Sequence, residues 1–299
     1  MKKIRKILFP TKFEDLSFPC IERLYPLQGA GLEEIIFLFV IDREEVAGDL
    51  FRGFDKQLVE QLREEARLRF EDWEKDVAPR GVRCRHLVEI GRPEGKILEI
   101  SCREEVDLIV SGRQRHVASD SLYLGGTAMG LLRRSAIPVF VCKHGAEGVC
   151  TPAGGHDFER ILFATDFSED AGHALEFVKS LAGVAQKVGV VHVIAEREFK
   201  KSSVEQIHSE EEQSQKQLDA ICAELAEVGL DAVPHLLAGE IHSQILQTAA
   251  DHRASLIVMG TKGRHGLKEV WLGSSSHRVA ELSSLPVILV PMERDECYI

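Results

Sequence analysis

The sequence predicts an α/β protein made of two tandem copies of a doubly wound domain, each a parallel sheet between two layers of helices. Three observations predict this fold class. The chain of 299 residues repeats its apolar runs once, about 150 residues apart. Short β-rich runs alternate with longer helical patterns within each copy. Strand-like runs such as 35–41 are apolar throughout, which is typical of strands buried on both faces.

The repeat is carried by matching segments. Three pairs share their apolar pattern at offsets of 148 or 154 residues: 7–13 with 161–167, 107–112 with 255–260, and 137–141 with 285–289. One period of this size indicates a duplicated domain, because the repeats of solenoid proteins are only ~20–50 residues long. We place the first domain at 1–143, a linker at 144–158 and the second domain at 159–293. The segment from Lys143 to Phe158 contains four glycines and one proline, a composition typical of a linker.

The elements of the second copy follow in a regular order. Strands are predicted at 159–165, 188–194, 232–237, 255–259 and 286–290, and helices between them at 168–185, 203–228, 241–252 and 274–284. Ser168 suits the N-cap of the first of these helices. The second helix of the first copy is predicted from apolar residues at helical spacing, which are Val59, Leu62, Ala66, Phe70, Trp73 and Val77. We expect both long helices to pack on the sheet.

Charge and hydropathy exclude several classes of function. The formal net charge is −11, with 24 basic and 25 acidic residues in the first 150 positions and 13 and 23 in the rest. Neither half carries the basic stripe of a nucleic-acid-binding protein, so no nucleic-acid partner is expected. No apolar run approaches the ~20 residues of a membrane helix, so no membrane partner is expected.

The seven cysteines form no CxxC pair and no Cys/His spacing that suits zinc. We therefore predict no metal site. We expect mostly reduced thiols in a cytoplasmic protein, with Cys142 in the core and Cys297 exposed in a polar tail.

The richest pattern follows the fourth strand of the second copy. Gly260 and Gly263 stand where the strand must turn away from the sheet, and glycine there allows positive φ and lets backbone N–H groups approach an anion. Gly273 and three serines then open the last helix, whose N-terminus suits a phosphate. A glycine loop with an ordinary serine cap is the alternative interpretation.

The spacing Gly260-x2-Gly263-x9-Gly273-Ser274 is similar to the nucleotide-binding signature of the universal stress protein family, G-x2-G-x9-G-[S/T]. The resemblance covers the whole chain as two copies and includes the strand that ends in Asp166 and the terminal PVILVP strand. It implies a Rossmann-like domain in each copy, with five parallel strands in the order 3-2-1-4-5. It also implies frequent dimerisation and, in one subfamily, ATP binding.

The same resemblance implies a role for each matching residue. Asp166, with Ala164 and Thr165, would hold the nucleoside, because a carboxylate can accept hydrogen bonds from both ribose hydroxyls. Val193 would face adenine. The glycine segment would line the nucleoside with Met259, Gly260, Thr261 and Gly263 and wrap the phosphates with Gly273, Ser274, Ser275 and Ser276. The implied ligand is ATP or AMP, with or without Mg²⁺. An exposed turn for Asp166 and a core position for Val193 stay open as alternatives.

The first copy departs from this pattern. Lys12 stands where the second copy has Asp166, Arg115 where it has Gly263, and Gly126 where it has Ser274. An ammonium group only donates hydrogen bonds, so Lys12 cannot accept them from ribose. We expect a degenerate site that does not bind ATP in the family manner. A basic pocket for another anion, formed by Lys12, Arg113 and Arg115, is the alternative.

These observations predict a stress-response protein whose second domain binds ATP or AMP and which acts through a nucleotide-dependent surface on an unidentified protein partner. We assign no catalytic residue. A slow ATPase or phosphotransferase is the alternative, but the P-loop pattern is absent and Glu269 is the only carboxylate within the glycine loop. A scaffold that binds no nucleotide is the third hypothesis.

The last strand of each copy, at 138–141 and 286–290, would form a sheet edge with unpaired backbone groups. Universal stress proteins resemble one another in pairing through this strand. We therefore expect the two copies to associate within the chain as a pseudo-dimer. A homodimer of whole chains through other surfaces stays open.

Overall fold

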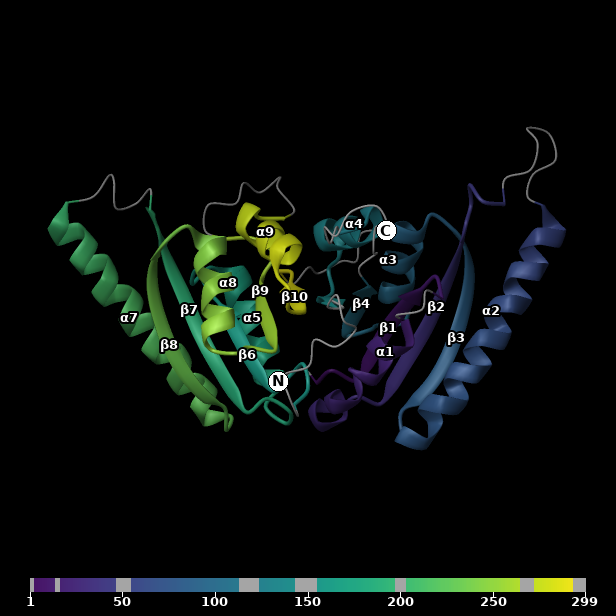
Figure 1. The fold of residues 1–299 in the computed structure, drawn as a ribbon, viewed down its shortest axis with the longest axis horizontal. Coiled ribbons are helices and arrows are strands. Elements are labelled where there is room, and N and C mark those ends of the chain that lie inside the picture. The colour runs from purple at the N-terminus through teal and green to yellow at the C-terminus, as the bar shows by residue number, and fades with distance from the viewer. Residues whose placement is uncertain are drawn as a thin grey trace.

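The computed structural model describes residues 3–13, 17–46, 55–112, 124–142, 155–196, 203–263 and 272–292. Its centre is one ten-stranded sheet in the order β3-β2-β1-β4-β5-β10-β9-β6-β7-β8 (Figure 1). The first half, up to β5, contributes five strands, and the second half contributes the other five in the mirrored sequence. The predicted α/β class with two doubly wound halves is therefore confirmed.

The first half contains the elements β1 (Lys6–Thr11), α1 (Ser17–Glu22), β2 (Glu34–Asp42), α2 (Lys56–Val77), β3 (Arg83–Gly91), α3 (Pro93–Arg103), β4 (Leu108–Gly112), α4 (Gly126–Arg134) and β5 (Val139–Cys142). The second half contains β6 (Arg160–Ala164), α5 (Glu169–Ser180), β7 (Lys187–Ala195), α7 (Val204–Glu227), β8 (Asp231–Gly239), α8 (Ile241–Asp251), β9 (Leu256–Gly260), α9 (Ser274–Leu282) and β10 (Val287–Val290).

Helices cover both faces of the sheet because successive strand residues point to opposite sides. Ile7 and Phe9 of β1 belong to one buried cluster, together with residues of α1, α2, α5 and α7. Leu8 belongs to the other, together with residues of α3, α4, α8 and α9. Each cluster extends through both halves. The long helices α2 and α7 lie at opposite ends of the molecule (Figure 1).

The two halves join through their last strands. β5 and β10 pair antiparallel, with Phe140 opposite Ile288, whereas the other strand pairs in the sheet are parallel. These two residues are 148 positions apart, so equivalent positions of the two copies meet, as at the twofold axis of an isologous dimer. The expected pairing within the chain is present in the structure.

The helix predicted over 168–185 ends earlier, at Ser180. Beyond it, Gly183 approaches Gly29 of the first half so closely that a Cβ at Gly183 would lie 2.0 Å from the Gly29 carbonyl oxygen. Gly29 and Gly183 are also equivalent positions, 154 residues apart. The end of this helix is thus shaped by the contact between the halves, which the local sequence does not encode.

The expectation of mostly reduced thiols is wrong for the described cysteines. Cys20 of α1 and Cys142 at the end of β5 form a disulfide across 122 positions of sequence, and Cys102 is also disulfide-bonded. Cys84 and Cys222 are free. Burial raises their thiol pKa values, to about 12 for Cys84 and about 11 for Cys222. Cys142 is fully buried, as expected, whereas Cys297 lies outside the described residues.

Residues 155–158, the described part of the predicted linker, pack on the first half. Asp157 is buried and pairs with Arg23, the residue after α1, at 2.7 Å. Phe158 is buried against Phe140, with ring centroids 5.7 Å apart. The chain therefore enters the second half along a fixed path. Within the described ranges, no helix is long and apolar enough to cross a membrane.

Candidate functional site

The predicted site residues gather at the carboxyl ends of β6 and β9 and at the start of α9. β6 and β9 are neighbours in the sheet. The chain leaves β6 toward α5 on one face and leaves β9 toward α9 on the other. Strand order reverses between these two strands. In open α/β sheets, such a switch point is where ligands bind.

Asp166 lies two residues beyond the end of β6 and is half-buried. Its Oδ1 accepts hydrogen bonds from the backbone N–H of Ser168 at 3.1 Å and from the Ser168 hydroxyl at 2.5 Å. Its Oδ2 lies 2.5 Å from the position that a Cβ at Gly263 would occupy. The structure therefore brings Asp166 and Gly263 together, although they are 97 positions apart, and it leaves no room for a side chain between them.

The turn that carries Asp166 is anchored by its neighbours. The Thr165 backbone N–H donates to Val191 at 2.9 Å, and its hydroxyl accepts from the Phe167 N–H at 3.0 Å. Phe167 has a positive φ of 59°, which reverses the chain and lets Ser168 cap α5. His192 of β7 lies 2.8 Å from the Thr165 carbonyl oxygen. The turn that carries Asp166 is thus held to β7 by the backbone of Val191 and the side chain of His192.

Asp170, in the first turn of α5, is a functional candidate that sequence reasoning missed. It is buried, and its Oδ2 accepts from the Thr261 hydroxyl at 3.1 Å and from the Lys262 backbone N–H at 3.0 Å. It thereby holds the beginning of the glycine segment against α5. A signal was available, because the first copy has Leu16 at this position and a change from leucine to aspartate is unusual in a core-facing site.

Two glycines of the motif are required by close approaches. A Cβ at Gly260 would lie 3.0 Å from backbone and side-chain atoms of Asp170. At Gly273, the N-cap of α9, it would lie 3.3 Å from the Thr261 carbonyl oxygen, which accepts the Gly273 N–H at 2.7 Å. None of the three motif glycines has a positive φ, so close packing rather than unusual backbone geometry explains them.

The three serines of α9 differ in their surroundings. Ser276 is buried, and its hydroxyl donates to the Gly260 carbonyl oxygen at 2.9 Å. Ser274 is exposed and Ser275 half-buried. No side chain caps this helix, because its N-cap is a glycine. The first-turn N–H groups of α9 have no acceptor within the helix, which begins where the Ser276 hydroxyl bonds the end of β9.

The apolar part of the predicted site lies on adjacent strands. Ala164 ends β6 and Met259 lies on β9, and the two are paired in the sheet. Val193 lies on β7, two residues beyond the partner of Ala164. All three are at least nine-tenths buried. Among the charged residues and histidine of the glycine segment, Lys262 is described, whereas Arg264, His265, Lys268 and Glu269 lie outside the described residues.

The equivalent region of the first half has the same turn but different side chains. Phe13 has the same φ of 59° as Phe167, and its N–H donates to the Thr11 hydroxyl at 2.8 Å. Lys12, Gly112 and Gly126 are brought together around a cavity. Arg113 and Arg115, which were considered as further cations, lie outside the described residues. Over the described ranges no group of three or more His, Cys, Asp or Glu side chains could hold a metal ion.

The sequence profile of the Universal stress protein family matches this chain twice, over residues 3–143 and 157–291. Among curated proteins, universal stress protein MJ0577 of Methanocaldococcus jannaschii is 34% identical over 153 residues, covering 44% of this chain and 94% of the relative. Universal stress protein YxiE of Bacillus subtilis is 34% identical over 146 residues, covering 44% and 99%. Each relative therefore corresponds to about half of this chain.

A solved structure matches nearly the whole molecule. The crystal structure of a universal stress protein from Archaeoglobus fulgidus covers 98% of this chain and 98% of its own, with a TM-score of 0.71 and 24% sequence identity. At this identity the likeness concerns the fold. It includes both halves, so the two-domain architecture has a counterpart among solved structures.

Proposed function

The chain belongs to the universal stress protein family, and from this we propose that its second half binds one adenine nucleotide, ATP or AMP. We propose that nucleotide occupancy controls the surface offered to a protein partner. The observation that carries the proposal is the contact between Asp166 and Gly263. It places a carboxylate oxygen against a glycine backbone at the switch point of the sheet, beside an uncapped helix N-terminus.

The proposed roles follow from the chemistry of each group. Asp166 accepts hydrogen bonds from the ribose hydroxyls, and Ser168 keeps its carboxylate in place. Ala164, Thr165, Val193 and Met259 form the wall against the nucleoside. The N–H groups of Ser274 and Ser275, with the hydroxyls of these two serines, receive the phosphates. Gly273, whose N–H donates to the Thr261 carbonyl oxygen, allows the close turn before them. Ser276 and Asp170 position this segment, because their polar atoms are bonded to the glycine segment itself.

Gly260, Thr261 and Gly263 then supply backbone rather than side chains. The Asp166 carboxylate oxygen lies where a Cβ at Gly263 would be, so a ribose bound to Asp166 would lie close to this glycine backbone. We propose that magnesium accompanies ATP only through the phosphates, since the proposed site has one carboxylate for ribose and a second, Asp170, bonded to the loop.

We favour binding over catalysis for this site. Efficient phosphoryl transfer needs an acid that holds the metal and a group that positions the nucleophile. Asp166 is proposed to be occupied by ribose. Turnover of ATP by the purified chain with magnesium tests this directly. A multiple-turnover rate within ~1–1000 per second would establish an enzyme instead.

Isothermal titration of the full chain with ATP tests the proposal itself. We expect one site per chain, and Asp166→Ala should weaken binding about 10- to 100-fold, because a charged acceptor is worth about 1.5–3 kcal/mol. Asp251→Ala is the matched control, since Asp251 is exposed at the end of α8. Two equal sites per chain, or an unchanged affinity of Asp166→Ala, would contradict the assignment to the second half.

The domain boundaries at 143/144 and 158/159 and the cytoplasmic location stay predictions. The disulfide between Cys20 and Cys142 matters for the latter, because such bonds persist mainly in oxidising compartments. Cell fractionation, with thiol trapping of the extracted protein, would test both the compartment and the redox state.

A further inference from the structure

The first half contains a cavity of about 320 Å³ at the carboxyl ends of β1 and β4. This volume is at the lower end of the range for small-molecule sites. Its wall is apolar and formed by Leu38, Val40, Ile97, Ala128 and Leu131, which belong to one buried cluster. Its mouth is lined by polar groups of Thr11, Lys12 and Thr127. An apolar pocket with a few convergent polar groups is typical of a ligand site.

Differences between the two halves account for the space. Ser111 of β4 stands at the position that Met259 fills in the second half, and Gly126 at that of Ser274. A Cβ at Gly112 or Gly126 would meet no atom of the described residues within 4 Å. The counterpart of Gly112 is Gly260, where a Cβ would collide with Asp170. The first half is thus open where the second half is filled by side chains.

Ser111 provides an independent sign of a ligand. It is only 7% exposed and lines the cavity, on the same side of β4 as the buried Ile109. Within the described part of the chain, its hydroxyl has no hydrogen-bond partner. Ser111 lines the cavity, and its oxygen is not among the fully buried unpartnered atoms of the described residues, so the hydroxyl is accessible from the cavity. A bound molecule with a polar group at this depth would provide the missing partner.

The charge at the mouth selects an anion. Lys12 is exposed and, among the described residues, has neither an ion-pair nor a hydrogen-bond partner. α4 points its N-terminus at the same place, with Gly125 as an N-cap that offers no side-chain acceptor. An ammonium group and a helix N-terminus both favour a negative charge. The second half has Asp166 in place of Lys12, so the side chains at this position carry opposite charges in the two sites.

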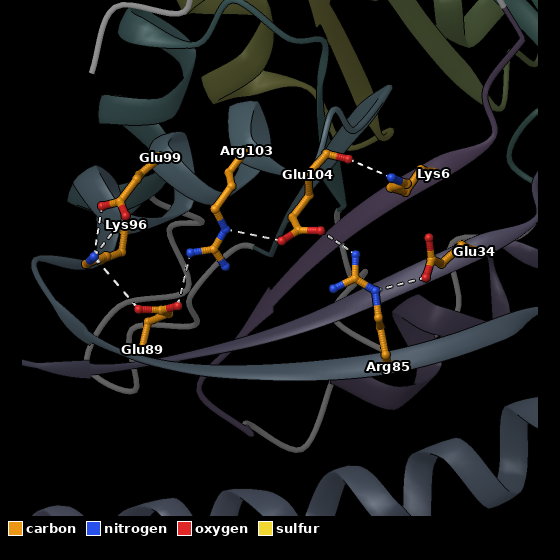
Figure 2. A network of polar contacts seen from close by, with 8 residues as sticks. All are labelled: Lys6, Glu34, Arg85, Glu89, Lys96, Glu99, Arg103 and Glu104. Atoms are coloured by element: carbon orange, nitrogen blue, oxygen red, sulfur yellow. Dashed lines mark hydrogen bonds and ion pairs between the residues drawn. The ribbon is translucent and has the colours of Figure 1, made fainter.

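The wall opposite β4 is held in place before any ligand binds. Figure 2 shows how Lys96 and Arg103 of α3 reach Glu89 of β3, while Glu104 at the end of α3 contacts Arg85. The Lys6 ammonium of β1 donates to the Glu104 carbonyl oxygen at 2.7 Å. This network fixes α3, which supplies Ile97 and Pro93 to the cavity. A preformed wall lowers the ordering cost of binding.

We propose that this cavity binds a small organic anion with an apolar body, whose carboxylate or phosphate group meets Lys12 and the N-terminus of α4. The apolar body occupies the space that Met259 fills in the second half, and a polar group within it bonds Ser111. The chain then carries two sites of different specificity, one in each half. This inference is independent of nucleotide binding in the second half.

Ligand-observed NMR on the full chain tests the proposal with three probes that share a benzene ring. Benzoate and phenyl phosphate carry the proposed anionic groups, and benzylamine carries the opposite charge. We expect both anions to bind and benzylamine not to bind. Lys12→Gln should weaken the anions about tenfold, whereas Lys56→Gln, at an exposed position of α2, should leave them unchanged.

Ser111→Met provides a second test, because it copies the residue that the second half accommodates in the same position. It should abolish binding of both anions while the thermal unfolding temperature stays within a few degrees of the unchanged chain. A ratio of affinities between benzoate and phenyl phosphate identifies which anionic group the site prefers.

Two results would overturn the proposal. One is equal binding of the anions to the unchanged chain and to Lys12→Gln. The other is displacement of the probes by ATP in the Asp166→Ala variant, which would make the cavity a nucleotide site. Failure of ATP to bind the second half would leave the probe titrations unaffected, so the two proposals fail separately.

Discussion

Asp170 shows how one buried carboxylate fixes the direction of the segment that follows β9. Its Oδ2 bonds both Thr261 and the backbone of Lys262, so the glycine segment leaves β9 in a defined direction. Gly260 is a glycine because Asp170 occupies the adjacent space. The position of the glycine segment therefore depends on Asp170, a side chain of α5 that lies outside this segment.

Gly263→Ala tests the contact with Asp166. The added Cβ would lie 2.5 Å from Oδ2, so the carboxylate must move away. We expect ATP affinity to fall at least about tenfold with little change in stability, because only the end of a side chain must shift. Titration calorimetry measures the effect. Gly126→Ala, at a position open to space, should bind ATP normally, and equal affinities for the two variants would argue against the contact.

Asp157 titrates in an unusual range. Burial raises the pKa of Asp157 to about 6, although the nearby Arg23 lowers it, and its Oδ2 has no hydrogen-bond partner among the residues that the structure describes. The folded chain therefore takes up a proton at this carboxyl between about pH 4 and pH 6, where the unfolded chain does not. Protonation stabilises the fold in acid, and this contribution is lost as the pH rises through about 6.

Urea unfolding from pH 4 to pH 7 measures this contribution. The shift of the Asp157 pKa from its ordinary value near 4 to about 6 should lower the free energy of unfolding as the pH rises from 4 to 7. The expected decrease is on the order of 2 kcal/mol. Asp157→Asn should remove that pH dependence, whereas Asp251→Asn, at an exposed position, should keep it. An identical slope in the unchanged chain and in Asp157→Asn would contradict the raised pKa.

At the scale of elements, α3 is attached to the sheet by charges rather than by apolar contacts alone. Arg85 of β3 bonds Glu34 of β2 at 2.9 Å and Glu104 at the end of α3 at 2.5 Å (Figure 2). Hydrogen bonding by Arg85 holds the pKa of Glu104 below its usual value. Its contribution to stability is therefore present at neutral pH and is lost as the pH falls through the lowered pKa.

Arg85→Met should lower the free energy of unfolding by about 1–2 kcal/mol at pH 7, because two partly buried carboxylates lose their partner. Arg83→Met on the same strand is the matched control. Arg83 is 73% exposed and pairs only loosely with Glu33, so its loss should cost less than about 0.5 kcal/mol. Denaturant unfolding compares them. Equal losses of unfolding free energy in the two variants would show that Arg85 contributes no more than an exposed surface charge.

At the scale of the whole molecule, the two halves form one sheet about a pseudo-twofold axis. Phe140 faces Ile288 across β5 and β10, and Gly29 faces Gly183, each pair being equivalent positions of the repeat. The disulfide from Cys20 to Cys142 and the pair of Arg23 with Asp157 hold both ends of the connecting segment near α1. The halves are therefore expected to unfold together.

Gly183→Ala tests this junction. A Cβ there would lie 2.0 Å from the Gly29 carbonyl oxygen, so the halves must move apart. We expect a loss of about 1–3 kcal/mol of stability, as for other overpacked sites. Gly172→Ala in α5, where a Cβ meets no atom within 4 Å, should be neutral or slightly stabilising. The unfolding temperature is measured by calorimetry. If both variants unfolded at the temperature of the unchanged chain, the predicted close contact between Gly29 and Gly183 would be wrong.

The sequence by itself determined the duplication, the α/β class and most element positions, because periods of 2 and 3.6 residues and repeated segments are local properties of a chain. The strand predicted at 255–259 lies at Leu256–Gly260, and the helix predicted at 241–252 at Ile241–Asp251. The glycine motif likewise predicted where the chain leaves β9 and where α9 begins.

Tertiary structure alone decided what depends on distant residues meeting. The disulfide of Cys20 with Cys142, the role of Asp170 and the early end of α5 all arise from contacts between segments far apart in sequence. The cavity around Ser111 also depends on distant residues, because small residues at separate positions in the sequence together leave its space unfilled. Which atoms become neighbours is set by packing, and no local pattern encodes it.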